Sequence, residues 1–226
     1  MTVLRSALLG IVGERGLLEG EDISTRSCDP FRAVAPQAPF IVRPASTQQV
    51  SDVMTLCQRL GQKVVTHGGR TGVAGGAYCA KDEIIVSLER MAGIIDICPV
   101  TQIAEVEAGM PVAALQDALV THGLTYPIDL GSKGSATIGG TIATNAGGIN
   151  VLRFGSTRHQ VVGIEAVLPN GDVIEHMAGL IKDNTGYDIA SLLCGSEGTL
   201  GIVTAARLRL LPLHTSRTTV LLGCDS

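Results

Sequence analysis

The chain has 226 residues, of which 45% are hydrophobic and 17% charged, and its formal net charge is −4. This balance supplies enough apolar side chains for a packed core and argues against disorder, while the scattered basic residues argue against nucleic-acid binding. The apolar runs are too short to cross a bilayer, and the N-terminal residues lack the features of a signal peptide, so the cytoplasm is the expected location.

The first third of the chain alternates between predicted helix and strand. Residues 1–20 predict an amphipathic helix followed by a polar connection. FIVRP then predicts a short strand, STQQVSDVMTLCQRLG a helix with a Ser/Thr cap and a terminal glycine, and KVVTH a second strand at 63–67. A strand, a helix and a strand in this order predict a β-α-β unit with parallel strands.

More strands and one clear helix follow. Short strands are predicted for EIIVSL (83–88), GIIDIC (93–98) and QIAEVEAG (102–109). PVAALQDALVTHG (111–123) predicts a helix with proline in its first turn and glycine at its end. VVGIEAVLPNGDVIEH predicts a hairpin, and GIVTAARLRLLPL (201–213) one long alternating strand. A boundary between two lobes is expected near 109–125.

The cysteines and histidines show no metal-ligand spacing. Without a CxxC motif, the six cysteines are expected to be buried, reduced thiols, with Cys194 beside a glycine-rich loop as the candidate reactive one. The histidines at 67, 122, 159, 176 and 214 likewise show no spacing typical of metal ligands. We therefore predict no metal site.

Glycine is the most informative residue type, with 28 occurrences. The first cluster, HGGRTGVAGG (67–76), directly follows a predicted strand, and successive glycines there would turn several backbone N–H groups into one anion-binding concavity. Thr71 adds a hydroxyl donor and Arg70 a positive charge. A tight turn without a ligand is the alternative for the loop, and a surface ion pair or an exposed carboxylate partner is the alternative for Arg70.

A second cluster, GSATIGGTIATNAGG (134–148), consists almost entirely of small residues, so that a planar ring could lie against its backbone. Small-residue helix packing is the alternative. Hydrogen-bonding side chains at the ring edge would come from Ser135, Thr137, Thr141, Thr144 and Asn145. A phosphate concavity and such a wall together predict a site for a nucleotide that carries a second ring system. Neither the GxxxxGK[ST] phosphate loop nor the GxGxxG dinucleotide fingerprint is present.

Several blocks of the sequence, in order, resemble a known family. They are HGGRTGVAGG, PIDLGSKGSATIGGTIATNAGGINVLRFGSTR, LPNGDV, KDNTGYD and GSEGTLGIVTAARLRLLP. Over about residues 36–215 the chain is similar to the FAD-binding domain of the vanillyl-alcohol oxidase (PCMH) type, and within it to the D-2-hydroxyglutarate and D-lactate dehydrogenase group.

The resemblance implies an α+β fold of two lobes with FAD between them. The smaller N-terminal β-α-β lobe would span about 36–109 and the larger mixed-sheet lobe about 110–215. An N-terminal helix and extension would precede them at 1–35, and the start of a connection to a further cap domain would follow at 216–226.

The same resemblance implies which residues bind FAD. The pyrophosphate loop would comprise His67, Gly68, Gly69, Arg70, Thr71, Gly72, Gly75 and Gly76. The middle of the cofactor would meet Pro127, Asp129, Leu130, Gly134 and Ser135. Further along it would meet Ile138, Gly139, Thr141, Thr144, Asn145, Gly147 and Gly148. The adenine side would be closed or supported by Glu197, Gly198, Gly201, Ile202 and Val203.

The implied function is a flavin-dependent dehydrogenase that oxidises a D-2-hydroxy acid resembling 2-hydroxyglutarate, lactate or glycolate, by hydride transfer to flavin N5. Asn145 could stabilise negative charge on the reduced ring. Family members with covalent flavin carry histidine directly after the first Gly-Gly pair, where this chain has Arg70, so non-covalent FAD is expected.

In this family a cap domain supplies the substrate-binding groups, the metal ligands and the base, so no catalytic residue is assigned in this chain. A cap and an electron acceptor are the expected partners. The alternatives are an FAD-binding module or truncated remnant without catalysis of its own, which needs a separate cap subunit, and a nucleotide binder that does not use flavin.

Overall fold

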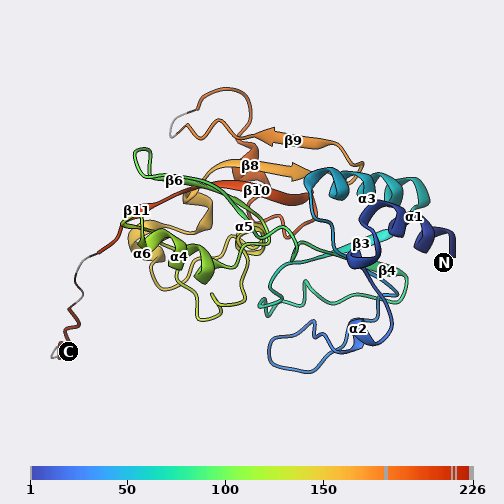
Figure 1. The fold of residues 1–226 in the computed structure, drawn as a ribbon. Helices are drawn as coiled ribbons and strands as arrows, with labels where there is room; N and C mark the ends of the chain where they lie inside the picture. Colours follow the sequence, from blue (N-terminus) through green and yellow to red (C-terminus); the bar gives the residue numbers. More distant parts are fainter. Residues whose placement is uncertain (1, 181–182, 215, 217, 224–226) are drawn as a thin grey trace.

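Two larger β-sheets, one two-stranded sheet and the helices packed against them make up the fold of the described residues (Figure 1). The computed structural model describes residues 2–180, 183–214, 216 and 218–223. The expected connection to a cap at 216–226 therefore lies partly outside the described residues. No helix within them has the length and apolar character needed to span a membrane.

The N-terminal part of the chain forms a four-stranded sheet of order β1-β2-β4-β3. β2 and β3 both pair with β4 in parallel, which confirms the predicted β-α-β unit, and β1 pairs with β2 antiparallel. The elements are α1 (Thr2–Val12), η1 (Glu14–Gly16), β1 (Leu17–Leu18), α2 (Glu21–Ser24), β2 (Ile41–Val42), α3 (Thr47–Leu60), β3 (Lys63–His67) and β4 (Glu83–Ser87).

Helix α3 begins and ends where its sequence predicts. The Ser46 hydroxyl accepts the backbone N–H of Gln49 at 3.2 Å, a standard N-terminal cap. Gly61 ends the helix at φ 62°, a conformation in which glycine avoids the steric penalty of a side chain. Helix α1 packs beside α3 (Figure 1). Because α3 leads almost directly into β3, the glycine loop begins at the end of a strand whose position the sheet fixes.

The rest of the chain builds a five-stranded sheet of order β5-β6-β10-β8-β9. Its strands are β5 (Ile94–Cys98), β6 (Ile103–Glu107), β8 (Val161–Val167), β9 (Val173–His176) and β10 (Ile202–Arg209). The other elements of this part are α4 (Val112–Val120), β7 (Leu124–Thr125), α5 (Ile138–Ala143), α6 (Val151–Phe154), η2 (Thr157–His159), α7 (Ile189–Leu193) and β11 (Leu211–Pro212).

The sheets differ from expectation in three respects. The larger sheet is antiparallel throughout, and the mixed sheet is the smaller one, because short hairpins join β5 to β6 and β8 to β9. The strand predicted over 201–213 stops at Arg209, and β11 pairs separately with β7. β10 is also buried almost throughout instead of alternating, since it is central in the sheet and α5 packs against it.

A fourth difference concerns the expected division near 109–125. β5 and β6 pair within the larger sheet, so the two sheets divide the chain between 88 and 93. The pairing of β6 with the distant β10 decides this, and local sequence carries no sign of it. The domain limits themselves remain a prediction.

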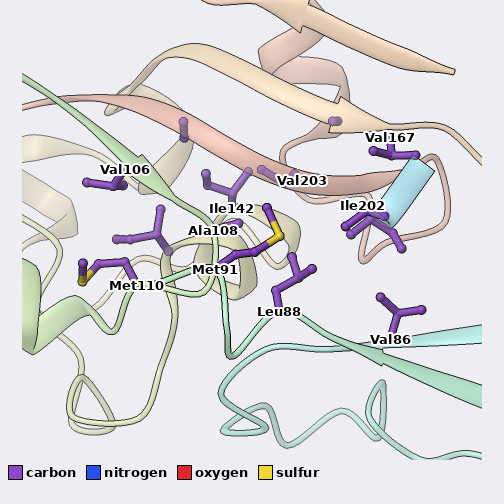
Figure 2. Packing of buried hydrophobic residues seen from close by; sticks show 14 of the residues in the cluster. Val86, Leu88, Met91, Val106, Ala108, Met110, Ile142, Val167, Ile202 and Val203 are labelled. Carbon is purple, nitrogen blue, oxygen red and sulfur yellow. The ribbon is translucent and has the colours of Figure 1, made fainter. Parts of the chain in front are cut away.

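A continuous cluster of buried side chains joins the two sheets (Figure 2). Val86 of β4 and Val106 of β6 contribute from the two sheets, and Ile142 of α5 lies among the labelled residues. Ile142 is fully buried, and a side chain of this size contributes about 1.5–3 kcal/mol when it leaves water. The shared core therefore fixes the two sheets relative to each other.

The described cysteines are free thiols, as predicted. Cys28, Cys57 and Cys194 are buried, whereas Cys79 and Cys98 are only partly so. Cys224 lies outside the described residues. Burial raises the pKa of the Cys194 thiol, and the nearby Arg158 only partly opposes this. The structure therefore gives Cys194 no activation as a nucleophile.

Candidate functional site

A cavity of about 400 Å³ lies where the three glycine clusters meet. One wall is the end of β3 with the loop that follows it (66–77), a second is the segment at 130–146 that contains α5, and a third comes from 196–203 before and within β10. Segments far apart in the sequence thus converge on one concave site, as ligand sites in proteins commonly do.

The structure brings most of the predicted site residues together around this cavity. Those that line it are His67, Gly68, Gly69, Arg70, Thr71, Gly72, Gly76, Leu130, Gly139, Thr141, Thr144, Glu197, Gly198, Gly201, Ile202 and Val203. Those that do not are Gly75, Pro127, Asp129, Gly134, Ser135, Ile138, Asn145, Gly147 and Gly148. The role of each in binding remains a prediction.

The first glycines of the loop at 67–76 touch protein. A Cβ atom added to Gly69 would lie 1.9 Å from the backbone oxygen of Ser135, and one added to Gly68 would lie 2.6 Å from the hydroxyl of Thr137. These glycines let the first cluster lie directly against the second. Their absent side chains are required by the packing of the two cavity walls.

Gly72 has a different surrounding. A Cβ atom added there meets no protein atom within 4 Å, and Gly72 lines the cavity. A Cβ atom at this position would therefore have room beside the protein, at a stretch of backbone that borders the cavity. Gly72 is thus part of a cradle that an added side chain would fill.

Arg70 supplies the positive charge of the cavity. It adopts φ 55°, which is uncommon for a residue with a side chain, and its Nη1 atom is buried without a hydrogen-bond partner. None of the ion pairs between described residues includes Arg70, so they give no support to the alternative of a salt-bridged surface arginine. Because buried charged donors almost always have partners, this atom fits an anionic ligand group such as a pyrophosphate.

His67 lines the same cavity without adding charge. Its side chain is almost fully buried, and Nε2 donates a hydrogen bond to the carbonyl oxygen of Ala77 at 2.8 Å. Burial, with smaller contributions from the positive charges of Arg70 and Arg26, lowers the pKa of His67 to about 4, although the hydrogen bond to Ala77 opposes this shift. The imidazole is therefore neutral at physiological pH, and its hydrogen bond closes the loop at 67–77.

The floor of the cavity is apolar. Leu88, Ala108, Ile202 and Val203 line it and also belong to the buried cluster (Figure 2). Beside them, Thr137 caps α5, its hydroxyl accepting the N–H of Gly140 at 3.3 Å. A charged loop above an apolar, small-residue floor suits a ligand that has both a phosphate part and a flat ring part.

Sequence reasoning missed part of this lining. The missed residues are Thr66, Val73, Ala74, Ala77, Leu88, Ala108, Ser132, Ala136, Gly140, Ala143, Ala146 and Ser196, and Thr137 was named only as a hydrogen-bonding candidate. Most of them are next to predicted positions in the sequence, and this proximity could have indicated them. Leu88 and Ala108 had no such signal, because they follow β4 and β6 and reach the site only through the packing of the two sheets.

Asn145 does not line the cavity, and its side-chain oxygen takes part in hydrogen bonds within the protein. Its Oδ1 atom accepts the backbone N–H of Arg158 at 3.0 Å and lies 3.7 Å from the Cys194 sulfur. Asn145 also adopts φ 48°. Its amide oxygen thus serves the conformation of the wall.

A second cavity, of about 290 Å³, is lined by several carboxylates. Glu105, Glu107, Glu165 and Glu175 line it, and Thr47 and Thr204 both donate hydrogen bonds to Glu165 at 2.6 Å. Carboxylates repel phosphate, so an anionic nucleotide is directed to the cavity that contains Arg70. Within the described residues, these side chains do not form a group able to hold a metal ion.

A protein family and known proteins of similar sequence both match more than half of this chain. Residues 38–176 match the family described as "FAD binding domain". The chain is 38% identical over 219 residues to a mitochondrial D-2-hydroxyglutarate dehydrogenase of Bos taurus, covering 97% of this chain and 40% of that protein. It is 43% identical over 192 residues to a D-2-hydroxyglutarate dehydrogenase of Xanthomonas citri, covering 85% and 41%. The chain thus spans about two fifths of the length of these relatives.

Solved structures show the same architecture. An alkyldihydroxyacetonephosphate synthase superposes with a TM-score of 0.83 at 20% identity, over 96% of this chain and 41% of that one. At this identity the likeness establishes the fold alone.

Proposed function

The chain belongs to the FAD binding domain family, and from this premise we propose that it is the cofactor-binding part of a flavin-dependent dehydrogenase that oxidises a D-2-hydroxy acid. The cofactor is FAD. The observation that carries the proposal is the buried, unpartnered Nη1 atom of Arg70 beside the open backbone of Gly72, at the meeting point of the three glycine clusters. The similarity to D-2-hydroxyglutarate dehydrogenases supports the substrate class.

The chain's own residues would hold and orient FAD. We propose that Arg70 and the backbone N–H groups of the loop at 68–72 bind the pyrophosphate, and that the small residues around α5 accept the flat ring system. The first glycine pair is followed by Arg70 in place of a histidine, which supports non-covalent attachment. The apolar floor at Leu88 and Ala108 would keep water from that face.

Bound FAD supplies a hydride acceptor for the substrate carbon. The groups that bind the hydroxy acid and remove its hydroxyl proton are proposed to lie in polypeptide other than this chain, in a cap equivalent to the remaining length of the relatives. An electron acceptor that reoxidises the flavin is the second proposed partner. The cytoplasm remains the proposed location, although the Bos taurus relative is named as mitochondrial.

Substrate oxidation is tested by complementation. The chain is loaded with FAD and mixed, without oxygen, with the part of the Xanthomonas citri relative that it does not match. We expect D-2-hydroxyglutarate, and not its L enantiomer, to bleach the visible flavin band. Because this chain presents the cofactor, the same mixture made with Gly72→Val should stay unbleached.

The same experiment separates the alternative function. A flavin-loaded mixture that no D-2-hydroxy acid bleaches, while the intact relative is reduced under the same conditions, would contradict the dehydrogenase assignment. The chain would then be an FAD-binding module without a part in hydroxy-acid oxidation.

A further inference from the structure

Two cavity walls contain residues in strained backbone conformations. Asn145 follows α5 at φ 48°, and Glu197 precedes β10 at φ 52°. Outside glycine, such left-handed conformations cost about 1–3 kcal/mol and persist only where the surroundings enforce them. Their neighbours Thr144, Ala146 and Ser196 line the cavity. Some part of the structure must therefore hold both walls in place.

Backbone hydrogen bonds join the two walls directly. The N–H of Gly195 donates to the carbonyl oxygen of Ile142 at 3.0 Å, and the N–H of Glu197 donates to that of Ala143 at 2.8 Å. On the other side, the N–H and the hydroxyl of Thr157 both donate to the carbonyl oxygen of Ala146, at 2.9 and 2.7 Å. The end of α5 is thus held between two other segments.

Arg158 connects all three segments. Its backbone N–H donates to the Oδ1 atom of Asn145 at 3.0 Å. Its guanidinium donates to the carbonyl oxygens of Ser191, within α7, and of Cys194, just beyond the C-terminal end of α7. A planar guanidinium can reach two carbonyl oxygens at once, and a positive charge suits the C-terminal end of a helix.

Arg158 does not itself line the cavity. A Cβ atom added to Gly195, which has φ 87°, would lie 3.2 Å from its Nη2 atom. The guanidinium therefore lies directly against the turn that leads from α7 to Glu197. It acts on the cavity through its neighbours.

We propose that Arg158 is a positioning residue for the cofactor: it holds the walls at 143–146 and 195–198 in the conformation that accepts FAD. The identity of the ligand, FAD, rests on the proposed function. The positioning role itself rests on the hydrogen bonds described above. It adds to the site a residue with no contact to the cavity.

The test compares Arg158→Met and Arg158→Lys with Arg153→Met. Arg153 is a matched control, because it is five residues away, carries the same charge, and stacks on the Phe154 ring at 5.1 Å while remaining exposed. Residues that hold the ligands of a metal site in place contribute about 10- to 100-fold to affinity. By the same reasoning we expect Arg158→Met to weaken FAD binding about tenfold and to alter the visible absorption bands of the bound flavin.

The lysine variant should lie between wild type and Arg158→Met, because an ammonium group keeps the charge and loses the planar fork. Arg153→Met should match the wild type in affinity and in spectrum. A purely structural role for Arg158 would lower stability without changing the spectrum of bound flavin, so wild-type affinity and bands in Arg158→Met would overturn the proposal.

Amide hydrogen exchange of the protein without flavin tests the same claim separately. The N–H groups of Gly195 and Glu197 should be protected in the wild type and in Arg153→Met, and should exchange faster in Arg158→Met. Equal protection in all three would overturn the positioning of the walls. A wild type that binds no FAD but shows this exchange pattern would instead contradict the proposed function alone.

Discussion

Gly72→Val is expected to yield folded, soluble protein that retains no flavin. A Cβ atom added at Gly72 meets no protein atom within 4 Å, and the backbone there is not left-handed. Gly72 lines the cavity, so we expect the branched side chain to obstruct the approach of the proposed pyrophosphate to the loop. We expect FAD affinity to fall at least about a hundredfold, which corresponds to roughly 3 kcal/mol. Flavin content after purification and titration with added FAD measure the effect.

Gly10→Val is the matched control. Gly10 lies in α1, far from the cavity in sequence, and a side chain there also meets nothing within 4 Å. This variant should bind FAD like the wild type. Stoichiometric flavin in Gly72→Val would contradict the assignment of the loop at 67–76 to the pyrophosphate.

Gly69→Ala is expected to destabilise the protein itself. Its Cβ atom would lie 1.9 Å from the backbone oxygen of Ser135 and 2.9 Å from the Cα atom of Ala136, so two backbone segments would have to separate. Overpacking of a close contact costs about 1–3 kcal/mol and sometimes more, and a clash between two backbones belongs at the upper end. We expect the free energy of unfolding to fall by at least about 3 kcal/mol, measured by urea denaturation without flavin.

Gly72→Ala makes the same chemical change three residues further along the loop. Since its Cβ atom meets no protein atom, its unfolding free energy should lie within about 0.5–1 kcal/mol of the wild type. Equal stability of the two variants would show that the first glycine pair does not bring the two cavity walls together.

The sequence was most informative where local chemistry decides structure. Ser46 and Gly61 mark the two ends of α3, and the glycines after β3 mark a loop that does line a cavity. In these places the capping side chain, the left-handed turn or the absent side chain has its reason within a few residues of chain.

Long-range pairing was the part that sequence reasoning could not supply. β5 and β6 follow β4 without a marked break, yet they join the sheet of β10, about 100 residues further on. That choice depends on contacts between residues far apart in the sequence. The same packing brings Leu88 and Ala108 to the cavity floor.

The roles of Arg70 and Asn145 also needed the structure. The sequence left Arg70 between a ligand contact and a surface ion pair, and the burial of its Nη1 atom without a partner favours the first. Asn145 carries the right side chain for a ligand contact, but its oxygen accepts the N–H of Arg158. Residue type alone cannot tell a group that faces a ligand from one that holds the wall behind it.

The most direct test of the account is the visible absorption spectrum of the purified chain, recorded before and after denaturation. Flavin bands in the native protein, present on isolation or restored by added FAD, are the predicted result, and after denaturation the flavin should separate completely from the polypeptide. A colourless protein that takes up no added FAD would contradict the cofactor site. Flavin that stays attached to the denatured chain would contradict non-covalent binding.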